Sequence, residues 1–175
     1  ICDPACGSGS FLLGAYDRLI RWTVDYYFKK YSTGSPVSKK DMELVYRDSG
    51  GAVRLSGKLK REILKSCIYG VDIDEQAAEV TRMSLSLKAL EDTRHDELYS
   101  EVNLFHETVL PDLKGNVKCG NSLIGTDYFA GKVLPDDEEM RRVNPFDWVH
   151  GFPEIMKVEG FDCIIGNPPY IRIQT

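Results

Sequence analysis

Short apolar runs that end abruptly at polar residues or glycine recur along the chain, and they predict buried strands of a parallel sheet. Three such ends are Ile1-Cys2 before Asp3, Cys67 to Val71 before Asp72, and Phe161 to Ile165 before Gly166, and the more polar segment Asn116 to Gly120 before Asn121 is interpreted as a further short strand. We expect the last run to be buried on both faces. Ligands of open α/β sheets lie at the carboxyl ends of strands, so these four ends form the candidate site.

Between the strands, apolar positions repeat every three or four residues and predict helices. From Ser10 we expect a helix of about five turns that packs on the sheet through a stripe of mainly apolar side chains. Glu75 to Leu90 should form another helix with Asp74 as its N-cap, and Gly57 to Ser66 a basic amphipathic helix. For the basic face, solvation is favoured over DNA contact. The stripe of the first helix comprises Leu12, Tyr16, Leu19, Thr23, Tyr26 and Lys30 or Tyr31.

The spacing of the motifs indicates an insertion. In compact nucleotide-binding units an acid follows the glycine loop by about 20 residues, yet Asp72 lies 63 residues after Gly9. We attribute the excess to an insertion over roughly residues 28–55. Residues 91–115 are interpreted as a connecting segment and Asp136 to Glu139 as a solvated turn. The aromatic segment from Asn144 to Glu154 is expected to pack onto the sheet.

Composition suits one domain of 175 residues, with 42% hydrophobic and 28% charged residues. The net charge of −5 does not suggest a basic nucleic-acid-binding face within this chain. Five cysteines without a Cys-x-x-Cys pair favour buried reduced thiols over disulfides, and three scattered histidines give no reason to expect a metal. With no long apolar span and no signal peptide at the start, a cytoplasmic location is expected.

The first strand end carries a glycine-rich turn, Asp3-Pro4-Ala5-Cys6-Gly7-Ser8-Gly9, directly before a helix. Gly7 and Gly9 allow the backbone to turn tightly and to approach a ligand, while Asp3 offers an acceptor to a cationic or hydroxylic group. A Gly-x-Gly alone is equally typical of an ordinary turn. Its Asp-Pro prefix and Ser-Phe-Leu suffix make the motif more selective.

The second and third strand ends carry residues suited to a nucleoside. Asp72 ends its strand where an acid commonly accepts both ribose hydroxyls. Asn121 offers an acceptor and donors to an adenine edge, and Leu123 or Ile124 could press on its face. A plain Asn-Ser turn explains this last segment equally well.

The fourth strand end is the stiff turn Asn167-Pro168-Pro169-Tyr170. An amine conjugated to a ring is a poor nucleophile because its lone pair is delocalised. Acceptors from Asn167 and a proline carbonyl would stabilise positive charge as that nitrogen attacks a methyl group. Tyr170 would stack on the ring. A rigid surface turn is the alternative interpretation.

Taken together, these motifs resemble the S-adenosylmethionine-dependent DNA adenine-N6 methyltransferases, and most closely the methylase domain of type IIG restriction-modification enzymes. The resemblance runs nearly from end to end. It implies a Rossmann-like methyltransferase fold, here partial, with about four mostly parallel strands flanked by helices. It also implies a site-specific DNA-methyltransferase, adenine-specific, that uses S-adenosylmethionine, acts on a flipped adenine and needs no metal.

The resemblance further implies a role for each motif. The first motif would hold the methionine part of the cofactor and the second its ribose and one adenine face. The third would bind the adenine edge, although relatives often carry an acid and then a large apolar residue where this chain has Asn121 and Ser122. The cofactor residues are Asp3, Pro4, Ala5, Cys6, Gly7, Gly9, Asp72, Ile73, Asn121 and Ser122, and the catalytic residues are Asn167, Pro168, Pro169 and Tyr170.

Compared with the family pattern, residues 1–175 correspond to a fragment of the catalytic domain. We expect a cofactor segment before the glycine loop, further strands and a target-recognition domain to lie outside these residues, and residues 1–175 contain no Asp…Glu-x-Lys nuclease motif. The strand order should be 3-2-1-4 with an open edge, which suggests self-association. We expect the fragment alone to be inactive and double-stranded DNA to be contacted mostly by other regions. Methylation of protein glutamine or an RNA base, or a non-catalytic fragment, are the alternatives.

Overall fold

A three-stranded parallel sheet lies at the centre of the structure, a computed structural model that describes residues 1–32, 38–91, 110–130 and 136–168. Strand β4 (Tyr69–Asp72) lies between β1 (Cys2–Asp3) and β5 (Val117–Cys119), giving the order β1-β4-β5. The register pairs Asp3 with Gly70 and Asp72 with Cys119. The predicted α/β class and the order of these strands are confirmed.

The predicted fourth strand is reduced to one parallel bridge between Ile164 and Cys2. Cys2 donates to the Cys163 carbonyl and Ile165 donates to the Cys2 carbonyl, both at 2.9 Å. The expectation that this run is buried on both faces is wrong: Ile164 is 59% exposed and Cys163 is exposed. The run has β1 on one side only, and no described element pairs with its outer edge.

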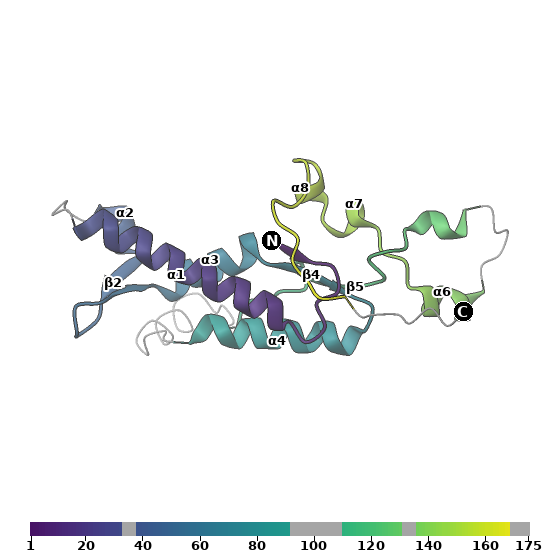
Figure 1. The fold of residues 1–175 in the computed structure, drawn as a ribbon, viewed down its shortest axis with the longest axis horizontal. Helices are drawn as coiled ribbons and strands as arrows, with labels where there is room; N and C mark the ends of the chain where they lie inside the picture. The colour runs from purple at the N-terminus through teal and green to yellow at the C-terminus, as the bar shows by residue number, and fades with distance from the viewer. Residues whose placement is uncertain (33–37, 92–109, 131–135, 169–175) are drawn as a thin grey trace.

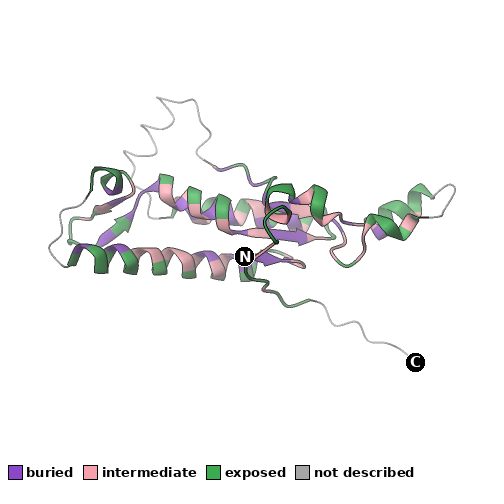
Figure 2. Ribbon diagram, turned by 90° about the horizontal axis from the view of Figure 1, so that it is seen from above, coloured by how far each residue is buried: buried purple, intermediate pink, exposed green. Residues whose placement is uncertain are grey.

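One face of the sheet is covered by α1 (Ser10–Ser32), α3 (Gly57–Cys67) and α4 (Glu75–Leu90), which pack on one another. Their apolar sides and the strands form one core, and the buried segments of Figure 2 (purple) follow the strands and one side of the neighbouring helices. A Cβ on Gly70 would lie 2.8 Å from Leu12, so α1 sits directly on β4. The members of this core that are less than 2% exposed are Leu12, Tyr16, Leu64, Ile68, Ala78, Leu85, Ala89, Leu113 and Val117.

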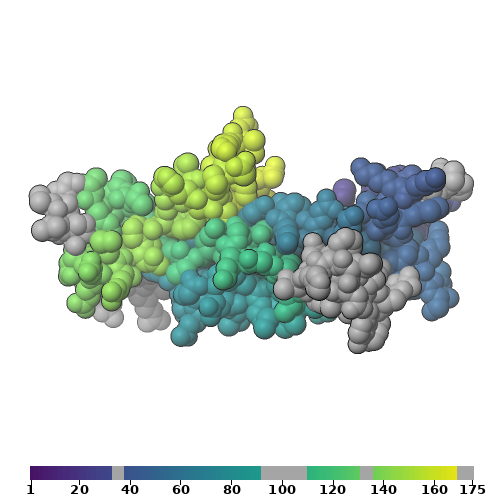
Figure 3. Space-filling view, turned by 180° about the vertical axis from the view of Figure 1, so that it is seen from behind, coloured from purple at the N-terminus to yellow at the C-terminus, as the bar shows by residue number. Residues whose placement is uncertain are grey.

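The opposite face is covered by the aromatic segment, as predicted. Val71 of β4 is fully buried against Phe146 and Phe152, with Trp148 and Phe161 packed around them. This segment includes α7 (Trp148–Gly151) and α8 (Pro153–Met156). Figure 3 shows it in yellow-green, reaching from the middle of the molecule toward the end opposite the blue hairpin region. Nearer that end lie η1 (Thr126–Phe129) and α6 (Asp137–Val143), as Figure 1 shows. The turn predicted at Asp136 to Glu139 is wrong, because these residues form the N-cap and first turn of α6.

The proposed insertion contains a short helix and a hairpin: α2 (Lys39–Met42), β2 (Val45–Arg47) and β3 (Val53–Leu55). They extend the molecule at one end, where they cover the second half of α1 (Figure 1). Tyr27 and Tyr31 of α1 are buried there, whereas Tyr26 is 49% exposed. The predicted stripe is therefore wrong at Tyr26, since the neighbouring Tyr27 is the buried residue. The second half of α1 packs on the hairpin and not on the sheet.

A carboxylate fastens this insertion to α1. Asp41 accepts hydrogen bonds from Lys30 at 2.8 Å and Ser38 at 2.7 Å, and also from the Tyr31 hydroxyl. These donors hold the pKa of Asp41 well below its usual range, Lys30 contributing most. Because Lys30 and Tyr31 lie in the last turn of α1, the helix end and the insertion are held together by one buried side chain.

The helix boundaries follow their caps. The Asp74 side chain accepts from Gln76 N–H, which confirms it as the N-cap of α4, and Ser56 caps α3 in the same way. The face of α3 is less solvated than predicted, because Lys60 is only 8% exposed and donates to the Glu91 carbonyl. Its aliphatic stem lies against the core while its charge reaches a backbone acceptor.

Thiol burial follows the predicted pattern only in part. All five cysteines are free, but only Cys2 and Cys6 are buried. Burial raises the pKa of each of these two thiols to about 12. In the described part of the chain, none of the helices combines the length and apolar character needed to cross a membrane.

Two leucines of α4 allow a matched test of this packing. Leu85 is fully buried and Leu87 is 53% exposed on the same helix. We expect Leu85→Ala to lower the free energy of unfolding by about 2–5 kcal/mol, because it leaves a cavity in the main core. Leu87→Ala should change it by less than about 1 kcal/mol. Chemical denaturation measures both, and equal losses would contradict the assigned faces of α4.

Candidate functional site

The glycine loop after β1 is held by hydrogen bonds at both of its ends. Gly9 N–H donates to the Cys6 carbonyl at 2.8 Å, and Leu13 N–H to the Gly9 carbonyl at 2.8 Å, which starts α1. Gly7 and Gly9 have φ of +53° and +83°, a region that favours glycine. A Cβ on Gly9 would also lie 2.8 Å from the Thr81 side chain. Both the positive φ and the lack of space therefore require a glycine at this position.

Asp72 joins this loop to the end of β4. One carboxylate oxygen accepts from Gly7 N–H at 2.7 Å and the other from Asp74 N–H at 3.0 Å. Each carboxylate oxygen can accept more than one hydrogen bond, so both retain capacity for a ligand hydroxyl. Asp72 is half-buried, which leaves it reachable from the sheet edge.

Asp3 lies beneath the loop and is 1% exposed. Its carboxylate accepts from Ala5 N–H at 3.0 Å. Burial raises the pKa of Asp3, the Ala5 hydrogen bond opposes the rise, and the negative charge of Asp72 adds to it. The carboxyl groups of Asp3 and Asp72 lie at the ends of adjacent strands and interact electrostatically. Together they favour a cationic or hydrogen-bond-donating ligand.

The rest of the first motif shapes the loop. Pro4 and Ala5 are half-buried, and Cys6 is 4% exposed with its side chain in the main core. Cys6 N–H donates to the Val71 carbonyl at 3.0 Å, extending the contact of β1 with β4. These three residues therefore support the loop from below.

The second and third strand ends lie side by side. Ile73 is 52% exposed, and its carbonyl accepts from the Cys119 thiol at 3.4 Å. Asn121 follows β5, and its side-chain oxygen accepts from Leu123 N–H at 3.1 Å in a local turn. The Ser122 carbonyl accepts from the Trp148 indole at 3.2 Å. Of the two apolar residues predicted to press on the adenine, Leu123 is 91% exposed and Ile124 is half-buried.

The target turn approaches the glycine loop through Gly166. A Cβ on Gly166 would lie 2.7 Å from an Asp3 carboxylate oxygen, closer than real side chains pack. Asn167 and Pro168 follow directly and are exposed, and Asn167 makes no hydrogen bond to any residue that the structure describes. Pro169 and Tyr170 lie outside the described residues. The turn thus begins beside the acid of the first motif.

Two contacts of this site were not predicted from the sequence. Thr81 donates to the Gly7 carbonyl at 2.8 Å from the middle of α4, and Gly166 allows the close approach to Asp3. Thr81 is 74 residues away from Gly7 and occupies an ordinary position in a helical pattern, so no local signal could have found it. Gly166 precedes a recognisable motif, and its lack of a side chain was the available clue.

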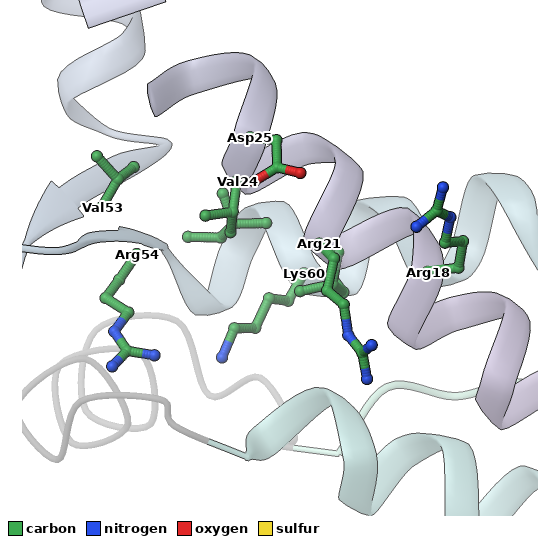
Figure 4. Close-up of a pocket in the computed structure, with 9 residues that line it drawn as sticks. Arg18, Arg21, Val24, Asp25, Val53, Arg54 and Lys60 are labelled. Carbon is green, nitrogen blue, oxygen red and sulfur yellow. The ribbon is translucent and has the colours of Figure 1, made fainter. Parts of the chain in front are cut away.

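A separate pocket of about 400 Å³ lies between α1, β3 and α3. Figure 4 shows the side chains of Arg21, Arg54 and Lys60 extending to the same side of it. Arg54 pairs with Asp48 at 2.9 Å. None of the strand-end motifs contributes a lining residue, so the predicted site residues converge elsewhere. Among the described residues, no group of three or more His, Cys, Asp or Glu side chains is arranged to hold a metal.

Asp3→Asn tests the energetic cost of burying this carboxyl. Because the folded-state pKa of Asp3 is raised, its ionisation favours unfolding, and the resulting loss of stability is present at neutral pH and disappears below the unfolded pKa. We expect the variant to be at least as stable as the wild type at pH 7, with the difference vanishing toward about pH 3. Urea denaturation at both pH values measures this. Asp162→Asn, at an exposed residue, is the control, and a variant less stable than the wild type at pH 7 would contradict the account.

Comparison with known proteins places this geometry in a family. The model of the Eco57I restriction-modification methylase family matches residues 66–175. The chain is 32% identical over 172 residues to the type II restriction enzyme and methyltransferase RM.Eco57I of Escherichia coli, covering 98% of the chain and 14% of the relative. It is 26% identical over 178 residues to the adenine-specific methyltransferase PglX of Streptomyces coelicolor, covering 98% and 12%.

A third relative, DNA methyltransferase A of Bacillus subtilis, is 27% identical over 173 residues, or 97% of the chain and 14% of the relative. The chain therefore spans about one seventh of the length of these relatives. No solved structure matches it. The family match covers more than half of the chain and includes the strand ends that carry Asp72, Asn121 and Asn167. The chain belongs to the Eco57I restriction-modification methylase family.

Proposed function

We propose that the chain forms part of a methylase that transfers a methyl group from S-adenosylmethionine to N6 of a flipped adenine in double-stranded DNA, within a restriction-modification system. The observation that carries the proposal is the bond from Gly7 N–H to Asp72, which places a glycine loop and a strand-end carboxylate at one sheet edge. The target turn starts beside the same loop, through Gly166 and Asp3. The names of the relatives support the chemistry.

The residues present suit this cofactor. The Asp72 oxygens that already hold Gly7 and Asp74 can still accept the two ribose hydroxyls. The buried Asp3 carboxylate suits the amino group of the methionine part, and exposed Ile73 offers an apolar surface to the adenine. When bound, S-adenosylmethionine supplies an electrophilic methyl group on a positively charged sulfur.

Asn167 carries the proposed catalytic role. Its side-chain oxygen and the Pro168 carbonyl would accept the N–H bonds of the target amine and stabilise positive charge that develops on this nitrogen. The exposure of Asn167, and its lack of a partner among the described residues, leave its amide available for that purpose. In this proposal Pro169 stiffens the turn and Tyr170 stacks on the flipped base.

We further propose that residues 1–175 are a segment of the catalytic domain with an insertion near 28–55, inactive in isolation. Other regions would complete the cofactor site and contact most of the DNA, which agrees with the net charge of −5. A cytoplasmic location follows from a DNA substrate. The open edge beside Ile164 would pair with a further strand of the whole protein, or with a second copy when the segment is alone.

Methyl transfer from labelled S-adenosylmethionine tests the proposal directly. The whole protein should label unmethylated double-stranded DNA, and digestion of the product should give N6-methyladenine. Fully methylated DNA with the same sequence is the control and should accept no label. Label that enters protein or RNA, and never DNA, would favour the alternative substrates and refute the proposal.

Two substitutions separate the proposed roles. Asn167→Ala should lower kcat by about 10²-fold or more, because it removes an acceptor used in the transition state, while cofactor affinity stays within about twofold. Asp72→Ala should weaken cofactor binding first, because it removes the ribose acceptor and releases Gly7. Calorimetry and single-turnover kinetics measure these effects. Variants that both fail only in cofactor affinity would show the division of roles to be wrong.

A further inference from the structure

Thr81 is a fully buried polar residue of α4 whose hydroxyl reaches out of its own helix. Its Oγ1 donates to the Gly7 carbonyl at 2.8 Å. A threonine within a helix often donates its hydroxyl to a carbonyl of the preceding turn of the same helix. Thr81 donates to the glycine loop and not to its own helix. The contact joins the centre of one helix to the loop that begins another.

The loop also presses directly on Thr81. A Cβ on Gly9 would lie 2.8 Å from both the methyl carbon and the hydroxyl oxygen of Thr81. The side chain therefore meets the loop at two points, one through hydrogen bonding to Gly7 and one through contact with Gly9. Its size and its hydroxyl serve separable purposes, which substitutions can distinguish.

Gly7 is consequently fixed on both sides. Its N–H is held by Asp72 at 2.7 Å and its carbonyl by Thr81 at 2.8 Å. The peptide between Gly7 and Ser8 is planar and trans, so the Ser8 N–H points opposite to the Gly7 carbonyl. Because that carbonyl faces buried Thr81, the Ser8 N–H faces away from α4. Ser8 is exposed, and its N–H makes no hydrogen bond to any residue in the described ranges.

We infer that Thr81 is a positioning residue of the cofactor site, which turns the Gly7–Ser8 peptide so that the Ser8 N–H donates to the carboxylate of the methionine part. This inference rests on the proposed function. Without the hydroxyl, the carbonyl of half-buried Gly7 loses this hydrogen bond, and the Gly7–Ser8 peptide is free to rotate away from its binding orientation. The loss of one well-placed hydrogen bond to a charged group corresponds to about tenfold in affinity.

The test compares Thr81→Val, which keeps the shape, with Thr81→Ser, which keeps the hydroxyl. In the whole protein, calorimetry gives Kd for S-adenosylmethionine and for its decarboxylated analogue, and thermal unfolding without ligand reports stability. We expect Thr81→Val to bind S-adenosylmethionine about tenfold more weakly, with KM for the cofactor raised and kcat little changed. Thr81→Ser should stay within about threefold of the wild type.

The decarboxylated analogue separates positioning from packing. The wild type should prefer the carboxylate-bearing cofactor, and Thr81→Val should lose most of that preference. Equal losses in the two variants, or a preference unchanged in Thr81→Val, would overturn the role of Thr81, as would a wild type that binds both cofactors equally. A wild type that binds neither cofactor would refute the proposed function itself.

Discussion

The hydrogen bond from Gly7 N–H to the Asp72 carboxylate is the interaction on which the site depends. It joins residues 65 positions apart and fixes the loop after β1 to the end of β4. The start of α1, the burial of Asp3 and the contact with Thr81 all depend on where that loop lies. A carboxylate that accepts backbone hydrogen bonds on both oxygens is held rigidly and still retains acceptor capacity. Such a carboxylate can fix the glycine loop and bind a ligand at the same time.

The two halves of the site differ in how firmly they are built. The glycine loop is held by backbone bonds to β4 and by side chains from β4 and α4. The target turn is held through one bridge to β1 and the close contact of Gly166 with Asp3. The cofactor half is therefore preorganised by residues that are far apart in the sequence. The target half depends on what packs beside Ile164. Asp3 touches both halves and couples them.

The sequence predicted most of the fold because its signals were local. Asp74 is a good N-cap, so the bounds of α4 could be predicted, and the strands that end before Asp72 and Asn121 were predicted as β4 and β5. Where the surroundings decide, the prediction was wrong. Tyr27 replaced Tyr26 in the buried stripe because the insertion packs on α1, and the run from Phe161 to Ile165 lacks a neighbour on its outer side.

The site residues could be chosen from their motifs, but the bonds between them could not. Nothing near Thr81 in the sequence indicates a contact with Gly7, because that contact exists only when α4 packs beneath the loop. The bond between Gly7 and Asp72 has the same character, since it joins residues 65 positions apart. Long-range hydrogen bonds of this kind are consequences of the fold.

A crystal structure of the whole protein with S-adenosylmethionine would show directly whether the edge that joins Asp72 to the glycine loop is the cofactor site. We expect the ribose hydroxyls on the Asp72 carboxylate, the methionine part over Asp3 and the glycine loop, and the Gly7 hydrogen bonds to Asp72 and Thr81 intact. A cofactor that lies elsewhere, or a loop that must release Asp72 before the cofactor can bind, would contradict it.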